Sequence, residues 1–137
     1  MTGLMVCVAV LAVASAYGVL QRRRSGRVRV RGRDDGKWLG AGELGSELGE
    51  RATLVQFSSA FCAPCRATRR VLGEVAGIVP GVRHIEIDAE AHLDLVRRLD
   101  ILKTPTVLVL DADGAVVRRA TGQPRKADVI AALGEAV

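Results

Sequence analysis

Apolar and polar positions divide this 137-residue chain into two parts. The first part, 4–20, is an unbroken apolar run without a charged residue, and the second contains short apolar segments separated by turn-forming residues. At about 1.5 Å per residue, a helix over this run spans roughly 25–30 Å, which is near the thickness of a bilayer's hydrocarbon core. The pattern therefore predicts one N-terminal transmembrane helix followed by one folded domain.

Within the second part, periodicity and turn signals predict alternating strands and helices. A short strand near Trp38 and an imperfect helix around 43–48 come first. The expected strands are 53–58, 82–88, 106–110 and 115–120, and the expected helices are 66–76, 92–99 and 126–136. Strand–helix–strand order predicts parallel pairing, and the turn ending at Gly114 predicts an antiparallel hairpin. Together they predict an α/β fold, a mixed sheet with helices on both faces.

Composition indicates how the core is built. Only four residues are aromatic, so aliphatic side chains must fill the interior. Helical spacing assigns the following side chains to the buried faces of two helices: Val71, Leu72, Val75 and Ile78 on the first, and Val129, Ile130 and Leu133 on the last.

The positive charge is concentrated next to the apolar run. The net charge is +5, and seven arginines between Arg22 and Arg33 make up much of the twenty basic residues. From Lys37 onward the chain carries thirteen basic and thirteen acidic residues. This distribution excludes a broad phosphate-binding face, so we expect no nucleic-acid partner.

These arginines also predict how the chain is organised. Positive flanks stay in the cytoplasm, so the domain is expected on the cytoplasmic side, with the arginine collar against anionic lipid head groups. The expected division is a transmembrane anchor over 1–21, a basic juxtamembrane linker over 22–36 and a globular domain over 37–137. Val28 and Val30 alternate with arginines in the linker, which makes a short edge strand possible.

Two other interpretations of the N-terminus remain open. Ala14-Ser15-Ala16 resembles a signal-peptide cleavage site, although the basic residues follow the apolar run instead of preceding it. Cys7 is a weak candidate for lipid modification, because no small residue comes directly before it.

A pair of cysteines carries the candidate chemistry. Cys62-Ala63-Pro64-Cys65 lies between an expected strand and an expected helix, which is the context of a redox-active pair. The amide groups at a helix N-terminus favour the thiolate of the first cysteine. Two buried apolar cysteines are the structural alternative. A zinc site needs four ligands, and only His84, His92 and the distant Cys7 remain, so no metal is expected.

The order of elements and this motif resemble the thioredoxin family from about Trp38 to Val137. Four features carry the resemblance: the strand before Cys62-Ala63-Pro64-Cys65, the segment Ile85-Glu86-Ile87-Asp88, the Thr104-Pro105 step before an apolar strand, and Gly122 after the final hairpin. The resemblance implies a thioredoxin-like mixed sheet and a disulfide between the two cysteines of the motif.

The resemblance also implies roles for individual residues. Cys62 would be the nucleophile and Cys65 the resolving thiol. Thr104, a cis Pro105 and Gly122 would form the substrate groove. Pro64 is typical of the reducing members of the family. Electrons would come from a reductase partner, so no bound cofactor is implied, and the substrates would be protein disulfides.

Four positions depart from the family pattern. Gln56 stands where the family usually has a buried acid, and its amide cannot accept a proton from the resolving thiol. Ser58 and Phe61 stand where the family usually has tryptophans, and only Phe61 keeps an apolar surface. His84 stands where a lysine is common. Gln56, Phe61, Pro64 and His84 are therefore expected to tune the site.

The function predicted from the sequence is reduction of protein disulfides by a membrane-tethered thiol–disulfide oxidoreductase. Two alternatives remain open. One is a disulfide reductase or isomerase outside the cytoplasm, and the other is a binding module without catalysis.

Overall fold

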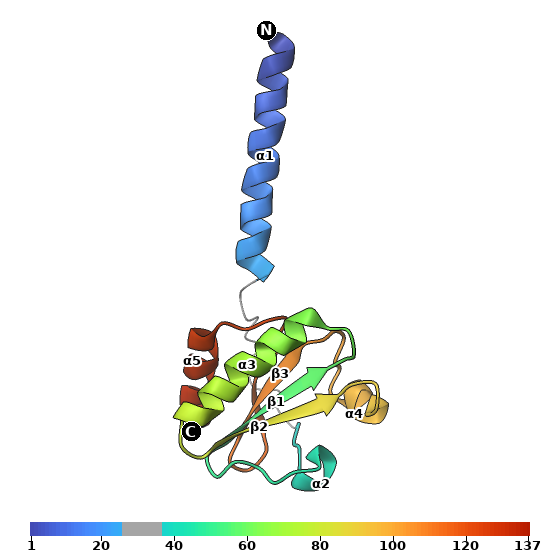
Figure 1. Ribbon diagram of the computed structural model, residues 1–137, viewed down its shortest axis with the longest axis vertical. Helices are drawn as coiled ribbons and strands as arrows, with labels where there is room; N and C mark the ends of the chain where they lie inside the picture. Colours follow the sequence, from blue (N-terminus) through green and yellow to red (C-terminus); the bar gives the residue numbers. More distant parts are fainter. Residues whose placement is uncertain (26–36) are drawn as a thin grey trace.

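The computed structural model of this protein describes residues 1–25 and 37–137 (Figure 1). The possible edge strand at Val28 and Val30 and four of the linker arginines lie outside the described residues. Helix α1, Thr2–Ser25, is long and apolar enough to cross a membrane by length and composition, with a mean hydropathy of 2.3 over its most apolar part. None of that part is buried. A signal sequence near the N-terminus can meet the same criteria of length and composition.

The remaining elements form an α/β domain that follows the predicted order. They are α2 (Ala41–Leu44), β1 (Ala52–Ser58), α3 (Ala63–Ile78), β2 (Val82–Asp88), α4 (Leu93–Arg98), β3 (Thr106–Asp111), β4 (Val116–Thr121) and α5 (Lys126–Ala136). Trp38 forms only a single antiparallel bridge, to Ala115, so the strand expected there is not formed. The helix expected around 43–48 is shorter and begins earlier, and it ends at Gly45 with a left-handed φ of 67°.

The four strands form one mixed sheet in the order β2-β1-β3-β4. β1 pairs in parallel with β2, with Val55 opposite Ile85, and antiparallel with β3, with Gln56 opposite Val107. The hairpin of β3 and β4 is antiparallel, with an irregularity between Val109 and Leu110. The parallel first pair and the antiparallel last pair confirm the topology predicted from the sequence.

Helices cover both faces of the sheet, which confirms the predicted layers (Figure 1). Successive side chains of β1 point to opposite faces. Leu54 packs with Leu72 of α3 and Val129 of α5 in one core, and Phe57 packs with Leu95 of α4 in the other. β1 is therefore buried along its whole length, and its C-terminal end delivers the chain directly to the cysteine pair.

Two side chains expected in the core are exposed. Ile78 is the last residue of α3, and the following Val79 packs against the core in its place. Ile130 lies beside the buried stripe of α5, because Val129 and Leu133, one helical turn apart, already define that stripe. Both predictions were wrong, because an apolar residue within a helix does not by itself establish which face it occupies.

Candidate active site

The cysteine pair sits at the junction of β1 and α3 and is closed as a disulfide. Cys62 is the N-cap of α3, and Cys65 lies in its first turn. Their sulfur atoms are 2.04 Å apart, and their Cα atoms 5.2 Å apart. Cys62 is partly exposed, whereas Cys65 is 1% exposed. Cys62 is therefore the more accessible residue of the pair.

The start of α3 provides hydrogen bonding to Cys62. The backbone N–H of Cys65 donates to Cys62 Sγ at 3.2 Å. Pro64 stands in the first turn, where its missing N–H costs no helical hydrogen bond. The carbonyl oxygen of Pro64 accepts a 2.8 Å bond from the hydroxyl of Thr68. A thiolate at Cys62 would meet a donor that the helix already holds in place, together with the positive end of the helix dipole.

A loop containing a cis proline is joined to the cysteine loop. The Thr104–Pro105 peptide bond is cis, as the family resemblance implied. The hydroxyl groups of Ser59 and Thr104 are hydrogen-bonded at 2.9 Å. The backbone N–H of Gly122 donates to the carbonyl oxygen of Pro105 at 2.9 Å. Thr104, Pro105 and Gly122 are thus brought together at the end of the sheet where the cysteine loop lies.

Gln56 lies behind Cys65 and is fully buried. Its Nε2 donates to the carbonyl oxygen of Cys65 at 2.8 Å and to Ser58 Oγ at 3.0 Å, and its Oε1 lies 3.0 Å from His84 Nε2. A backbone carbonyl only accepts hydrogen bonds, so the amide nitrogen of Gln56 must face Cys65. Its oxygen then faces His84, whose Nε2 must carry the hydrogen.

His84 is half-buried on β2 and has one charged pair nearby. Burial lowers the pKa of His84 below the usual 6.5, the carboxylate of Glu86 opposes this effect, and the guanidinium of Arg69 adds to it. Arg69 and Glu86 pair with each other, with Arg69 Nη2 2.7 Å from Glu86 Oε1. His84 is therefore neutral at neutral pH and donates through Nε2 to Gln56.

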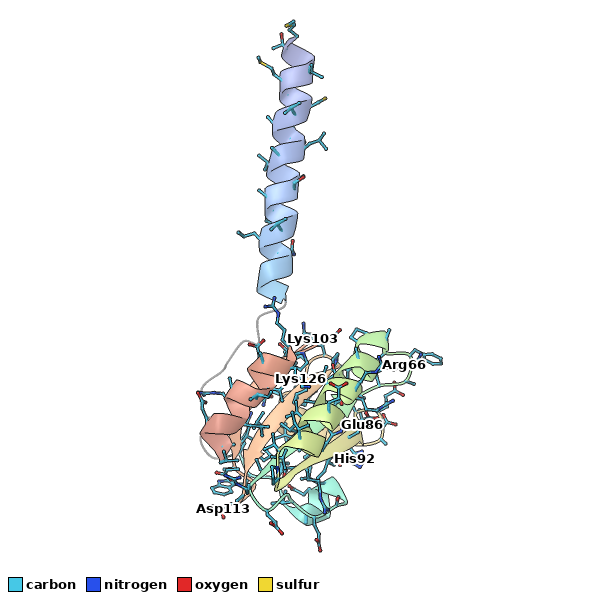
Figure 2. All side chains as sticks on the ribbon, turned by 60° about the vertical axis from the view of Figure 1, so that its left-hand side comes forward. Arg66, Glu86, His92, Lys103, Asp113 and Lys126 are labelled. Atoms are coloured by element: carbon cyan, nitrogen blue, oxygen red, sulfur yellow. A yellow bond between two sulfur atoms is a disulfide. The ribbon has the colours of Figure 1, made fainter. Side chains whose placement is uncertain are left out.

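Phe61 stands fully exposed directly before Cys62, with a left-handed φ of 59°. At the same end of the domain, the chain around α3 and the cis-proline loop carries positive charge, and Figure 2 shows Arg66 and Lys103 there. In the described part of the chain, no group of three or more His, Cys, Asp or Glu side chains is placed to hold a metal ion.

Most of these residues stand out in the sequence, but three of their contacts do not. Ser58 appeared only as a lost tryptophan, although it accepts a hydrogen bond from Gln56. Ser59 was not singled out, although it links the cysteine loop to Thr104. Short polar residues next to a cysteine motif are the signal that would have found both. The bond between His84 and Gln56 depends on the parallel register of two strands.

Comparison with known proteins agrees with this site. The thioredoxin family model matches residues 43–135, which is more than half of the chain. The chain belongs to the thioredoxin family. With its cysteine pair closed as a disulfide at the start of α3, it is a thiol–disulfide oxidoreductase.

This domain is similar in sequence and in structure to thioredoxins of several organisms. It is 32% identical over 90 residues to a thioredoxin of Mycolicibacterium smegmatis, covering 64% of this chain and 80% of the relative. It is 30% identical over 87 residues to thioredoxin H4-1 of Oryza sativa subsp. japonica, covering 62% of this chain and 66% of the relative. Chloroplastic thioredoxin z has a similar structure, with a TM-score of 0.56 and 26% identity over 62% of this chain and 77% of that one.

Oxidized mitochondrial thioredoxin 3 from Saccharomyces cerevisiae shares the fold, with a TM-score of 0.55 at 18% identity over 62% of this chain and 78% of that one. None of these alignments extends over the whole of this chain, so the family resemblance describes the α/β domain.

Proposed function

We propose that this protein reduces protein disulfides from a membrane-tethered position, with Cys62 as the nucleophile and Cys65 as the resolving thiol. The observation that carries this assignment is the difference in accessibility between the two sulfurs. Cys62 is partly exposed and accepts the N–H of Cys65, whereas Cys65 is buried against Gln56.

The proposed reaction has two exchange steps. In the first, the Cys62 thiolate attacks one sulfur of the substrate disulfide, forms a mixed disulfide and releases one substrate thiolate. In the second, the Cys65 thiolate attacks Cys62 Sγ, closes the Cys62–Cys65 disulfide and releases the second substrate thiolate. Two electrons pass to the substrate, and the two protons lost by the cysteines end on its thiols through solvent. A protein reductase returns two electrons to the disulfide, and no bound cofactor takes part.

The substrate groove is assigned to the backbone around Thr104, Pro105 and Gly122. Proline has no N–H, so the substrate segment pairs with the neighbouring Thr104. The bond between Ser59 and Thr104 holds this backbone beside the cysteine loop. Four further residues tune the site. Phe61 contributes to its surface and Pro64 to the start of α3, while Gln56 and His84 form the hydrogen bonds behind Cys65.

The proposed organisation is an anchor over 1–21, a basic linker over 22–36 and a thioredoxin domain over 37–137, with the domain in the cytoplasm. Support comes from the apolar, exposed span Thr2–Gln21 of α1, which contains no charged side chain, and from the arginines that follow this span in the sequence. A reporter fused after Val137 tests the orientation. Activity of a cytoplasm-specific reporter is the expected result, and activity only outside the cytoplasm would favour the extracytoplasmic alternative or a cleaved signal.

Turnover of insulin disulfides with dithiothreitol as the electron source tests the reductase assignment. The full chain should accelerate precipitation of the insulin chains, and Cys62→Ser should abolish the acceleration. Cys7→Ser serves as the matched control and should leave it unchanged. An equal rate for the wild type and Cys62→Ser would contradict the proposal and favour a binding module.

A further inference from the structure

Ser58 places a buried hydroxyl group directly behind the cysteine pair. It is the last residue of β1, and its side chain lies on the same face of the sheet as that of Gln56, two positions earlier. Ser58 is only 5% exposed. Gln56 Nε2 donates one hydrogen to Ser58 Oγ at 3.0 Å and the other to the carbonyl oxygen of Cys65 at 2.8 Å. Because both acceptors bond to the same nitrogen atom, the hydroxyl of Ser58 lies close to Cys65.

The directions of these hydrogen bonds follow from the chemistry of each group. The carbonyl oxygen of Cys65 can only accept, so the amide nitrogen of Gln56 is the donor at that end. The same nitrogen donates to Ser58, whose oxygen is therefore the acceptor. A serine hydroxyl carries a single hydrogen, and the bond with Gln56 does not use it. His84 completes the network from the other side, because its Nε2 donates to Gln56 Oε1.

The hydroxyl hydrogen of Ser58 is free while the cysteine pair is oxidised. Within residues 1–25 and 37–137, this hydroxyl donates no hydrogen bond to another protein group. A buried donor without an acceptor is unfavourable, and native structures contain few of them. In the disulfide, the sulfur of Cys65 carries no charge and is a weak acceptor. The thiolate that this sulfur forms after reduction is charged and accepts a hydrogen bond more strongly.

We propose that Ser58 donates a hydrogen bond to the Cys65 thiolate and thereby accelerates the second exchange step. The proposal rests on the reductase function proposed above and adds one group to it. In that step the proton of Cys65 leaves to solvent, and the thiolate attacks Cys62 Sγ. The sulfur–sulfur bond between Cys62 and the substrate breaks, and the substrate sulfur departs as a thiolate. Ser58 keeps its own proton, while Gln56 holds the serine oxygen in place.

Two opposing changes set the size of the effect. A hydrogen bond to a charged sulfur should raise the thiolate fraction of Cys65 by about tenfold. A stabilised thiolate is also a weaker nucleophile, and this loss cancels nearly half of the gain on a logarithmic scale. We therefore expect the second exchange step to be about threefold faster with the hydroxyl than without it.

A single-turnover reaction with dithiobis-nitrobenzoate follows both exchange steps, because each step releases one absorbing thiolate. The parent is the full chain carrying Cys7→Ser in phosphatidylcholine nanodiscs, reduced, freed of reductant and mixed with the reagent in stopped flow. The first release depends on the reagent concentration and reports attack by Cys62. The second release is independent of that concentration and reports attack by Cys65. Ser58→Ala should keep the first rate and slow the second by about threefold.

Ser58→Thr retains a hydroxyl and should restore the second rate, which a role in packing alone does not predict. Ser46→Ala is the matched control, because the Ser46 hydroxyl contacts Arg83 at the end of the parallel strands away from the cysteines. It should leave both rates unchanged. An unchanged second rate in Ser58→Ala, or equal slowing of both steps, would overturn the role of Ser58 while the reductase function stands. If the parent chain releases no thiolate at all, the reductase function fails first.

Discussion

The side-chain amide of Gln56 donates a 2.8 Å hydrogen bond to the carbonyl oxygen of Cys65. This bond joins β1, an inner strand of the sheet, to the first turn of α3, directly behind the disulfide. The same amide group contacts Ser58 and His84, so one buried side chain links two strands and the helix that carries both cysteines. A neutral, fully buried amide therefore lies directly behind Cys65.

Replacing Gln56 by leucine should destabilise the domain. Gln56→Leu keeps a similar volume but leaves the carbonyl oxygen of Cys65 and the ring N–H of His84 without this partner. An unsatisfied buried polar group costs about 1–3 kcal/mol, and the free energy of unfolding of the oxidised chain should fall by that order in urea titration. Gln123→Leu is the control, because Gln123 is exposed and its replacement should change little. Equal losses in the two variants would contradict the importance of the buried amide.

Gln56→Asp tests the consequence for catalysis. A carboxylate behind Cys65 accepts the proton that an amide cannot, so the second exchange step should become faster than in the wild type. Stopped-flow measurement of the release of reduced substrate from the mixed disulfide checks this. Gln56→Asn, which is equally short but not ionisable, is the control for the lost length. Unchanged release in Gln56→Asp would mean that proton transfer from Cys65 does not need a group at this position.

Burial of His84 should make the stability depend on pH. Because the folded state lowers the pKa of His84 below 6.5, the unfolded chain binds more protons in the window just below that value. The contribution of neutral His84 to the free energy of unfolding is therefore fully present above pH 6.5 and is lost as the pH falls below that value. Between about pH 7 and about pH 5, the wild type should lose more unfolding free energy than His84→Gln, which keeps an amide donor toward Gln56. Equal losses of unfolding free energy in the wild type and in His84→Gln would contradict this account of His84.

The main features of the fold could be predicted because each is determined by local sequence. The segment 53–58 is predicted as a buried strand, and β1 is buried along its length because Leu54 and Phe57 face two different cores. Asp111 to Gly114 forms a turn because Gly114 adopts a φ of 90°. The strand at Trp38 could not be distinguished from the single bridge that forms, because one apolar residue without alternating neighbours does not specify how far pairing extends.

The motif also indicated the cysteines, but the contacts around them could not be predicted. Gln56 meets groups that are two, nine and twenty-eight positions away in the sequence. The contacts with Cys65 and His84 depend on the position of α3 on the sheet and on the register between β1 and β2, and neither is encoded by local pattern.

Two glycines should respond in opposite ways to substitution by alanine. At Gly114 a Cβ atom would lie 2.3 Å from the carbonyl oxygen of Leu39, and the φ is left-handed. Gly114→Ala should therefore lower the unfolding free energy by more than about 1 kcal/mol. Gly73 lies within α3 with open space around it, so Gly73→Ala should raise the unfolding free energy by about 0.5–1 kcal/mol. Thermal denaturation of both variants checks the pair, and a stabilising Gly114→Ala would contradict the observed turn.

Trapping of the mixed disulfide tests the roles of the two cysteines most directly. Reduced Cys65→Ser, incubated with insulin and analysed by non-reducing electrophoresis and peptide mass mapping, should accumulate an adduct joined through Cys62, because no resolving thiol remains. Cys62→Ser should form no comparable adduct. An adduct joined through Cys7, or equal accumulation in the two variants, would contradict the assignment of Cys62 as the nucleophile and Cys65 as the resolving thiol.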